Sequence, residues 1–220
     1  MKLVSIYKWL IIIGVFFPVI GISQSATYKE NLKKDIALFE SAKTASDFIY
    51  AANCFEKLAV TEKKEWLAFY YAGLCDALAA FEKQNKDIDT YCDKADALAR
   101  KADSLSKNNS EVAVLKSMIA AARINVNKAQ RGQKFGLMAS KFAAEALKLD
   151  EANPRAHFVK GKAILNTPPT LGGGEKKAKP IFESVLEKLK TYKSDSNLYP
   201  SWGREEAEKE LKKINLSTKK

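Results

Sequence analysis

The sequence is poor in the residues that most often build catalytic and metal-binding sites. Its 220 residues include three cysteines and a single histidine, His157. A single histidine excludes most catalytic schemes in which a histidine activates a nucleophile. Of these schemes, a Cys–His pair is the one that stays open. The cysteine spacings of 21 and 17 residues match no compact zinc motif. We therefore expect no catalytic residue, no metal, no cofactor, a packed or partly exposed His157, and a protein that is not an enzyme.

Glycine and proline are scarce as well, with 10 and 6 copies, whereas Ala, Lys, Leu and Glu recur along the chain. Alanine and the straight-chain residues lose little conformational freedom in a helix. After residue 27 there is no sustained alternation of apolar and polar residues, which a half-buried strand would require. This composition excludes a sheet-rich fold and predicts an all-α protein.

The first residues differ from the rest of the chain. Two lysines precede an apolar run, Trp9–Ile22, which is followed by small and polar residues. This order is typical of a secretory signal peptide, and Gly21 and Ser23 predict cleavage before Gln24. A retained membrane anchor is the alternative, although a span needs about 20 apolar residues and this run is shorter. We expect a periplasmic or secreted protein that meets a membrane only through this segment, if it is not cleaved.

Positive charge is in excess, with a formal net charge of +11. Acidic residues accompany the basic ones except in the stretch Val112–Ala144, which contains no Asp or Glu. This stretch carries Lys116, Arg123, Lys128, Arg131, Lys134 and Lys141. It is either a solvated face or a patch for an acidic partner or an anionic surface. Export would separate the protein from most nucleic acid, so no nucleic-acid partner is expected.

The three cysteines, Cys54, Cys75 and Cys92, allow one disulfide in an oxidising compartment. Cys75 and Cys92 are the favoured pair because they fall on the two arms of one predicted helical hairpin. The alternative is that all three are small buried apolar residues. The sequence leaves both options open.

Small residues recur at a fixed interval of 44 positions. Three interlocked series share this interval: Ala51, Ala95 and Ala139; Leu58, Ala102 and Ala146; and Gly73, Ser117 and Gly161. Such a period indicates repeated supersecondary units. The last unit shows that each unit contains two helices, because a helix starting at Asn153–Pro154 is separated from a second one by the Pro- and Gly-rich residues 167–174.

The order of small residues resembles the tetratricopeptide repeat family, in the form found in exported bacterial proteins. The residues that carry the resemblance are Gly161, Ala178, Phe182 and Val185 in one unit, Ser117, Ala139, Ala143 and Ala146 in another, and Gly73, Ala95, Ala99 and Ala102 in a third. Together with a degenerate first unit they cover residues 28 to 190. The family repeat is about 34 residues long, so this chain has extra residues at Glu82–Thr90 and Asn125–Lys134, as longer helices or as loops. HEAT-like repeats, with periods of about 40–47 residues, are the structural alternative.

The resemblance implies a right-handed superhelix of antiparallel helix hairpins. We divide the sequence into a signal peptide (1–23), a helical repeat domain (24–195), and a C-terminal capping helix and tail (196–220). The charged helix predicted from Gly203 to about Asn215 would be the polar cap that a solenoid needs, with Trp202 packed beneath it.

The resemblance also implies a concave groove that holds a protein or peptide partner. Its expected lining is Tyr70, Leu74, Val114, Met118, Arg155, Phe158 and Lys162. A partner with apolar side chains and an acidic segment or C-terminal carboxylate would fit, unless several of these positions pack under neighbouring helices. Two other hypotheses are a helical enzyme or accessory subunit acting on envelope polysaccharide, and binding of an anionic surface through residues 112–144.

Overall fold

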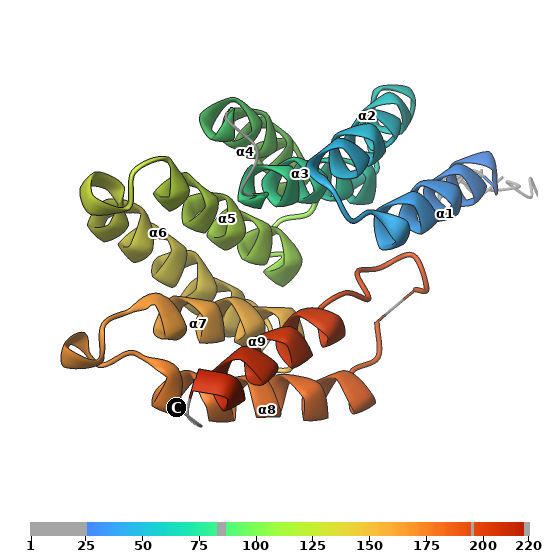
Figure 1. Ribbon diagram of the computed structural model, residues 1–220. Coiled ribbons are helices and arrows are strands. Elements are labelled where there is room, and N and C mark those ends of the chain that lie inside the picture. The colour runs from blue at the N-terminus through green and yellow to red at the C-terminus, as the bar shows by residue number, and fades with distance from the viewer. Residues whose placement is uncertain (1–25, 83–86, 195, 218–220) are drawn as a thin grey trace, which may run out of the picture.

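The computed structural model describes residues 26–82, 87–194 and 196–217, and the predicted signal peptide lies outside them (Figure 1). The described residues form α1 (Ala26–Ser41), α2 (Ala45–Thr61), α3 (Trp66–Phe81), α4 (Ile88–Leu105), α5 (Ser110–Arg123), α6 (Lys128–Leu149), α7 (Pro154–Asn166), α8 (Glu175–Thr191) and α9 (Arg204–Ser217). Short 3₁₀ helices, η1 (Ile124–Val126) and η2 (Pro169–Leu171), lie in two of the connections. No strand occurs in these ranges, which confirms the predicted all-α fold.

Consecutive helices pack as hairpins, α3 on α4, α5 on α6 and α7 on α8 (Figure 1). The first helices of the hairpins, α3, α5 and α7, also contact one another and form an inner layer. The second helices lie outside them, and α9 packs against α8 at the end of the series. This arrangement confirms the predicted superhelix of hairpins. No helix of the described ranges is both long enough and apolar enough to cross a membrane.

The 44-residue interval has a direct structural cause, because two of the small-residue series meet each other within the α3–α4 and α5–α6 hairpins. A Cβ atom added to Gly73 would lie 3.3 Å from the carbonyl oxygen of Ala95. In the next hairpin the Ser117 hydroxyl donates a hydrogen bond of 2.9 Å to the carbonyl of Ala139. Small side chains let the two helix backbones approach closely at each crossing, so the interval is the chain length between successive crossings.

Asparagine side chains start three of the helices. The Asn109 side chain accepts hydrogen bonds from the backbone N–H groups of Glu111 and Val112, and Asn153 and Asn127 cap α7 and α6 in the same way. Such caps satisfy backbone donors that have no partner inside the helix.

The extra residues predicted at Asn125–Lys134 mostly belong to a longer helix, since α6 begins at Lys128 and has 22 residues.

The segment between α8 and α9 folds back over the inner layer. We call residues 196–203 the strap. Tyr71 donates a hydrogen bond to the carbonyl of Leu198 (3.1 Å), and Trp202 donates one from its indole nitrogen to the Tyr70 hydroxyl (3.1 Å). The Trp202 ring also meets Phe158 edge to face, with 5.9 Å between the ring centroids. The strap therefore joins α3 to α7, and Trp202 packs on these two inner helices, whereas the sequence predicted it beneath the C-terminal helix.

All three cysteines are free thiols, so the favoured pairing of Cys75 with Cys92 is wrong. Cys75 and Cys92 do lie on the two arms of one hairpin, α3 and α4, and both are buried. Cys92 directs its thiol to the carbonyl of Ile119 on α5, at 3.9 Å, rather than to α3. Burial raises the pKa of the Cys92 thiol to about 12 and also raises that of Cys75. Both act as small apolar core residues.

Candidate functional site

The residues predicted to line a groove are mostly in the core. Tyr70, Leu74, Val114, Met118, Arg155 and Phe158 are buried, and Lys162 is half-buried. The strap covers Tyr70 and Phe158, while Lys162 forms an ion pair with Glu210 on α9 (3.0 Å). An external partner could contact the two aromatic side chains only after the strap leaves. The sequence suggested a free inner wall because nothing in it indicated that the strap returns to this face.

Arg155 instead belongs to a buried polar cluster between α5 and α7. Its guanidinium group donates to the Glu111 carboxylate at 2.6 and 2.8 Å, and the two side chains are only 2% and 6% exposed. Asn153 donates to Ser110 and to Glu111 at 2.9 and 2.7 Å. Burial lowers the pKa of Arg155, but the Glu111 charge and hydrogen bonds, together with Tyr70 and Tyr192, outweigh burial and the net shift of the pKa is upward. The cluster is closed by its own hydrogen bonds, so it orders the fold and leaves no room for a substrate.

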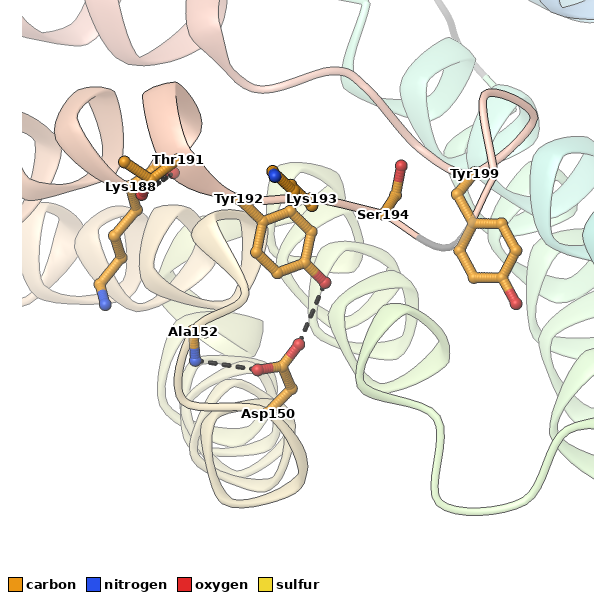
Figure 2. Close-up of a pocket in the computed structure, with 8 residues that line it drawn as sticks. All are labelled: Asp150, Ala152, Lys188, Thr191, Tyr192, Lys193, Ser194 and Tyr199. Atoms are coloured by element: carbon orange, nitrogen blue, oxygen red, sulfur yellow. Dashed lines mark hydrogen bonds between the residues drawn. The ribbon is translucent and has the colours of Figure 1, made fainter.

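A pocket of about 490 Å³ lies directly beside this cluster (Figure 2). It lies between the turn that joins α6 to α7, the end of α8, and the segment that leads into the strap. We call it the Tyr192 pocket. Its lining is Asp150, Ala152, Lys188, Thr191, Tyr192, Lys193, Ser194 and Tyr199.

Tyr192 is held by charged neighbours on both sides. Its hydroxyl donates a hydrogen bond of 3.0 Å to Asp150, whose carboxylate also accepts one from the backbone N–H of Ala152 (Figure 2). The Arg155 guanidinium lies 5.3 Å from the centroid of the Tyr192 ring. Burial and the Asp150 charge raise the pKa of Tyr192 to about 12. The phenol is therefore neutral at physiological pH and fixed in orientation.

The rest of the pocket supplies cations and a second aromatic side chain. Lys188 and Lys193 bring ammonium groups, and Tyr199 is drawn on the opposite side from Tyr192 (Figure 2). The Tyr199 ring packs edge to face on Trp66, with 5.5 Å between centroids. His157 is half-buried nearby, with its Nε2 atom 2.8 Å from the carbonyl of Glu151. Aromatic faces and ammonium groups in one pocket suit a flat organic anion.

A second pocket, of about 960 Å³, lies at the other end of α8, and we call it the α8–α9 pocket. It is lined by the end of α7, the loop through η2, the first turns of α8 and the second half of α9. The lining residues are Leu165, Asn166, Thr167, Pro168, Pro169, Gly174, Glu175, Lys176, Lys179, Pro180, Glu183, Glu210, Lys213 and Ile214.

The acid-free stretch Val112–Ala144 is partly neutralised by another helix. Arg123 pairs with Asp93 and Asp96 of α4 at 2.7 and 2.5 Å, and Arg131 pairs with Asp89 at 2.7 Å. Asp89 lies in the first turn of α4. Lys116 also pairs with Asp103 of α4, at 3.3 Å. The acids that pair with Arg123 and Arg131 come from 27 to 42 residues earlier in the chain, outside the stretch itself. Within the described ranges, no His, Cys, Asp and Glu side chains gather to hold a metal ion.

No protein-family model matches the chain, and no curated protein matches it either. The predicted membership of the tetratricopeptide repeat family is therefore not supported beyond the helical-hairpin architecture. Among solved structures, the chain is similar to the HusA haemophore from Porphyromonas gingivalis, with 32% sequence identity and a TM-score of 0.79. The similarity covers 90% of this chain and 97% of the haemophore chain. The chain therefore belongs to the family of the HusA haemophore.

Proposed function

We propose that this protein is an exported, non-enzymatic carrier that binds haem, and that the Tyr192 pocket holds the porphyrin. The observation that carries the proposal is the 32% identity to a haemophore over 97% of that protein's chain. A relationship over nearly the whole length includes every surface that could form a ligand site. The closed polar cluster at Glu111 and Arg155 argues for a rigid binding scaffold rather than a reaction centre.

The chemistry of the Tyr192 pocket suits the three parts of haem: a flat aromatic ring, two carboxylates and an iron ion. Tyr199 lines the pocket as an aromatic wall for the porphyrin ring, and Lys188 and Lys193 line it as cations for the carboxylates. Tyrosine oxygen is a known type of axial ligand for haem iron, which makes Tyr192 the candidate ligand. The pocket volume of about 490 Å³ lies within the range of small-molecule sites, about 300–1,000 Å³.

The pKa of Tyr192 gives the proposal a sharp consequence. A phenol with a pKa of about 12 must lose its proton to become an iron ligand, so iron binding releases a proton at neutral pH. The affinity for haemin is therefore expected to rise between pH 6 and pH 9. The affinity for iron-free protoporphyrin is expected to change less, because it needs no phenolate.

The test is titration of the purified protein with haemin, followed by Soret absorbance and by quenching of tryptophan fluorescence. Trp66 is a suitable reporter because it contacts Tyr199. We expect saturable binding, weakened at least about tenfold, or about 1.4 kcal/mol, by Tyr192→Phe and by the double variant K188E/K193E. The matched control is K176E/K179E in the α8–α9 pocket, which should bind haemin normally. Absence of saturable binding would refute the function, and loss of binding only in the control would place the porphyrin in the other pocket.

The hypothesis of a protein or peptide partner in the groove stays a prediction. It requires the strap to leave Tyr70 and Phe158, which it covers in this structure. No contact or pocket in the described ranges favours the envelope-polysaccharide hypothesis. The anionic-surface hypothesis loses three of its six cations, since Lys116, Arg123 and Arg131 are paired with α4.

A further inference from the structure

The α8–α9 pocket is the larger of the two pockets, and its apolar lining is entirely aliphatic. Leu165, Pro168, Pro169, Pro180 and Ile214 supply that lining. Among the residues that the structure describes, no aromatic ring, His, Cys or Met lines this pocket, so these residues offer neither a stacking face nor a ligand for haem iron. Aliphatic walls around about 960 Å³ suit a flexible hydrocarbon rather than a flat aromatic ring.

Two exposed leucines lie close in sequence to residues that line the pocket. Leu171 is 75% exposed and lies two residues after Pro169, while Leu216 is 58% exposed and lies two residues after Ile214. They are among the most exposed large apolar side chains of the described residues. Exposed apolar groups beside a preformed cavity mark a binding surface more often than scattered ones do.

The pocket lining contains three lysines and three glutamates, and two of the lysines can meet an anionic head group. Glu210 is bound by both Lys162 (3.0 Å) and Lys213 (3.1 Å), so its charge is more than balanced. Lys176 and Lys179 line the pocket from α8, and in the described ranges neither forms an ion pair. Of the two remaining acids, Glu175 already accepts a hydrogen bond from Ser217, whereas Glu183 is exposed.

The wall of the pocket is preformed. A Cβ atom on Gly173 would lie 2.2 Å from the Thr167 carbonyl oxygen, so only glycine fits the close approach there. Gly174 adopts a positive φ of 91° and donates a backbone hydrogen bond of 2.9 Å to the carbonyl of Ile164. These contacts fix the loop before any ligand arrives, which lowers the entropic cost of binding.

We propose that the α8–α9 pocket is a second binding site, which takes the acyl chain of an anionic amphiphile. The hydrocarbon chain lies against the aliphatic residues, and the anionic head lies near Lys176 and Lys179. Free fatty acids and anionic phospholipids share this chemistry. The inference is independent of haem binding, because it depends on a different end of α8 and on different side chains.

The test uses the full chain and two probes, oleate followed by native mass spectrometry and phosphatidylglycerol vesicles followed by co-flotation. We expect saturable binding of at least one probe, weakened at least tenfold in K176E/K179E and also reduced in L171S/L216S. The matched controls are Leu137→Ser, an equally exposed leucine on α6, and K188E/K193E at the Tyr192 pocket. Both controls should bind as the wild type does.

The two probes separate the sources of the ligand. Binding of oleate indicates a free fatty acid, and binding of vesicles alone indicates a phospholipid. Failure of both probes, or equal binding by K176E/K179E and the wild type, would overturn the proposal. Competition of haemin for oleate would assign the pocket to porphyrin instead. The K176E/K179E variant is also titrated with haemin. If the porphyrin occupies the Tyr192 pocket, this variant binds haemin normally, so a failure of the amphiphile proposal can be told apart from a failure of the haem proposal.

Discussion

Asp76 on α3 is a buried carboxylate whose charge is poorly compensated. Its side chain is fully buried, and neither of its oxygens has a hydrogen-bond partner in the described ranges. The nearest cation, Lys94, lies 3.6 Å away and is closer to Glu56, at 2.9 Å. Burial raises the pKa of Asp76 to about 6, although Lys94 opposes the shift. The ionised form therefore lowers stability at neutral pH.

Replacing Asp76 with Asn should change how stability depends on pH. The folded pKa of about 6 exceeds the ordinary value of 3.8, so the folded state holds more protons than the unfolded state between these values. The free energy of unfolding contributed by Asp76 therefore falls as pH rises from about 4 to about 6. Urea unfolding at pH 4.5, 5.5 and 7 should show a wild-type loss of stability that Asp76→Asn lacks, and Asp76→Asn should be the more stable protein at pH 7. Parallel pH curves would contradict this assignment.

At the scale of helices, close crossings hold each hairpin together. In the α7–α8 hairpin Gly161 faces the Phe182 ring, and a Cβ atom there would lie 2.9 Å from a ring carbon. Gly136 on α6 has open space instead, with nothing within 4 Å of the equivalent position. The same residue type thus has opposite roles, one at a contact and one at the surface.

Alanine at these two glycines should have opposite effects. Gly161→Ala overpacks the crossing and should cost about 1–3 kcal/mol. Gly136→Ala removes backbone freedom from a half-buried helix position with open space for a methyl group, and it should stabilise the protein by about 0.5–1 kcal/mol. Thermal and urea unfolding of both variants measure the difference. Equal effects of the two substitutions would show that Gly161 is not a packing contact.

At the scale of the whole molecule, the strap connects parts of the chain that the hairpin series keeps apart. Its contacts join residues 127 and 132 positions apart in the sequence, Tyr71 with Leu198 and Tyr70 with Trp202. Ser201 also reaches Glu40 at the end of α1, at 3.3 Å. A solenoid usually depends on contacts between neighbouring units, so this long-range closure adds cooperativity.

Removing the strap's anchor should weaken the whole fold. Trp202→Ala removes the hydrogen bond to Tyr70 and the ring contact with Phe158. Because Trp202 is only half-buried, we expect a loss of about 2–3 kcal/mol, below the range of about 3–5 kcal/mol for a fully buried tryptophan. Urea unfolding measures it, with the exposed Leu216→Ala as control. A cost no greater than that of the control would show that the strap does not stabilise the inner layer.

Local sequence by itself determined the helices, their pairing and their period. Asn153 and Pro154 start α7, residues 167–174 end that helix, and the small residues 44 positions apart mark the crossings. These features depend on residues close in the chain or on steric size, and both are visible in a linear pattern. The hairpin architecture was therefore predictable.

Only the tertiary structure decided which side chains are free. Tyr70 and Phe158 had the spacing of groove residues, yet Trp202 of the strap, which lies 44 positions after Phe158, covers both. The partners of Arg155 and Arg123 lie 44 and 27–30 residues away, and the Tyr192 pocket combines a turn with the end of α8 and the strap. Contacts across such distances depend on how the hairpins stack, and they leave no local pattern in the sequence.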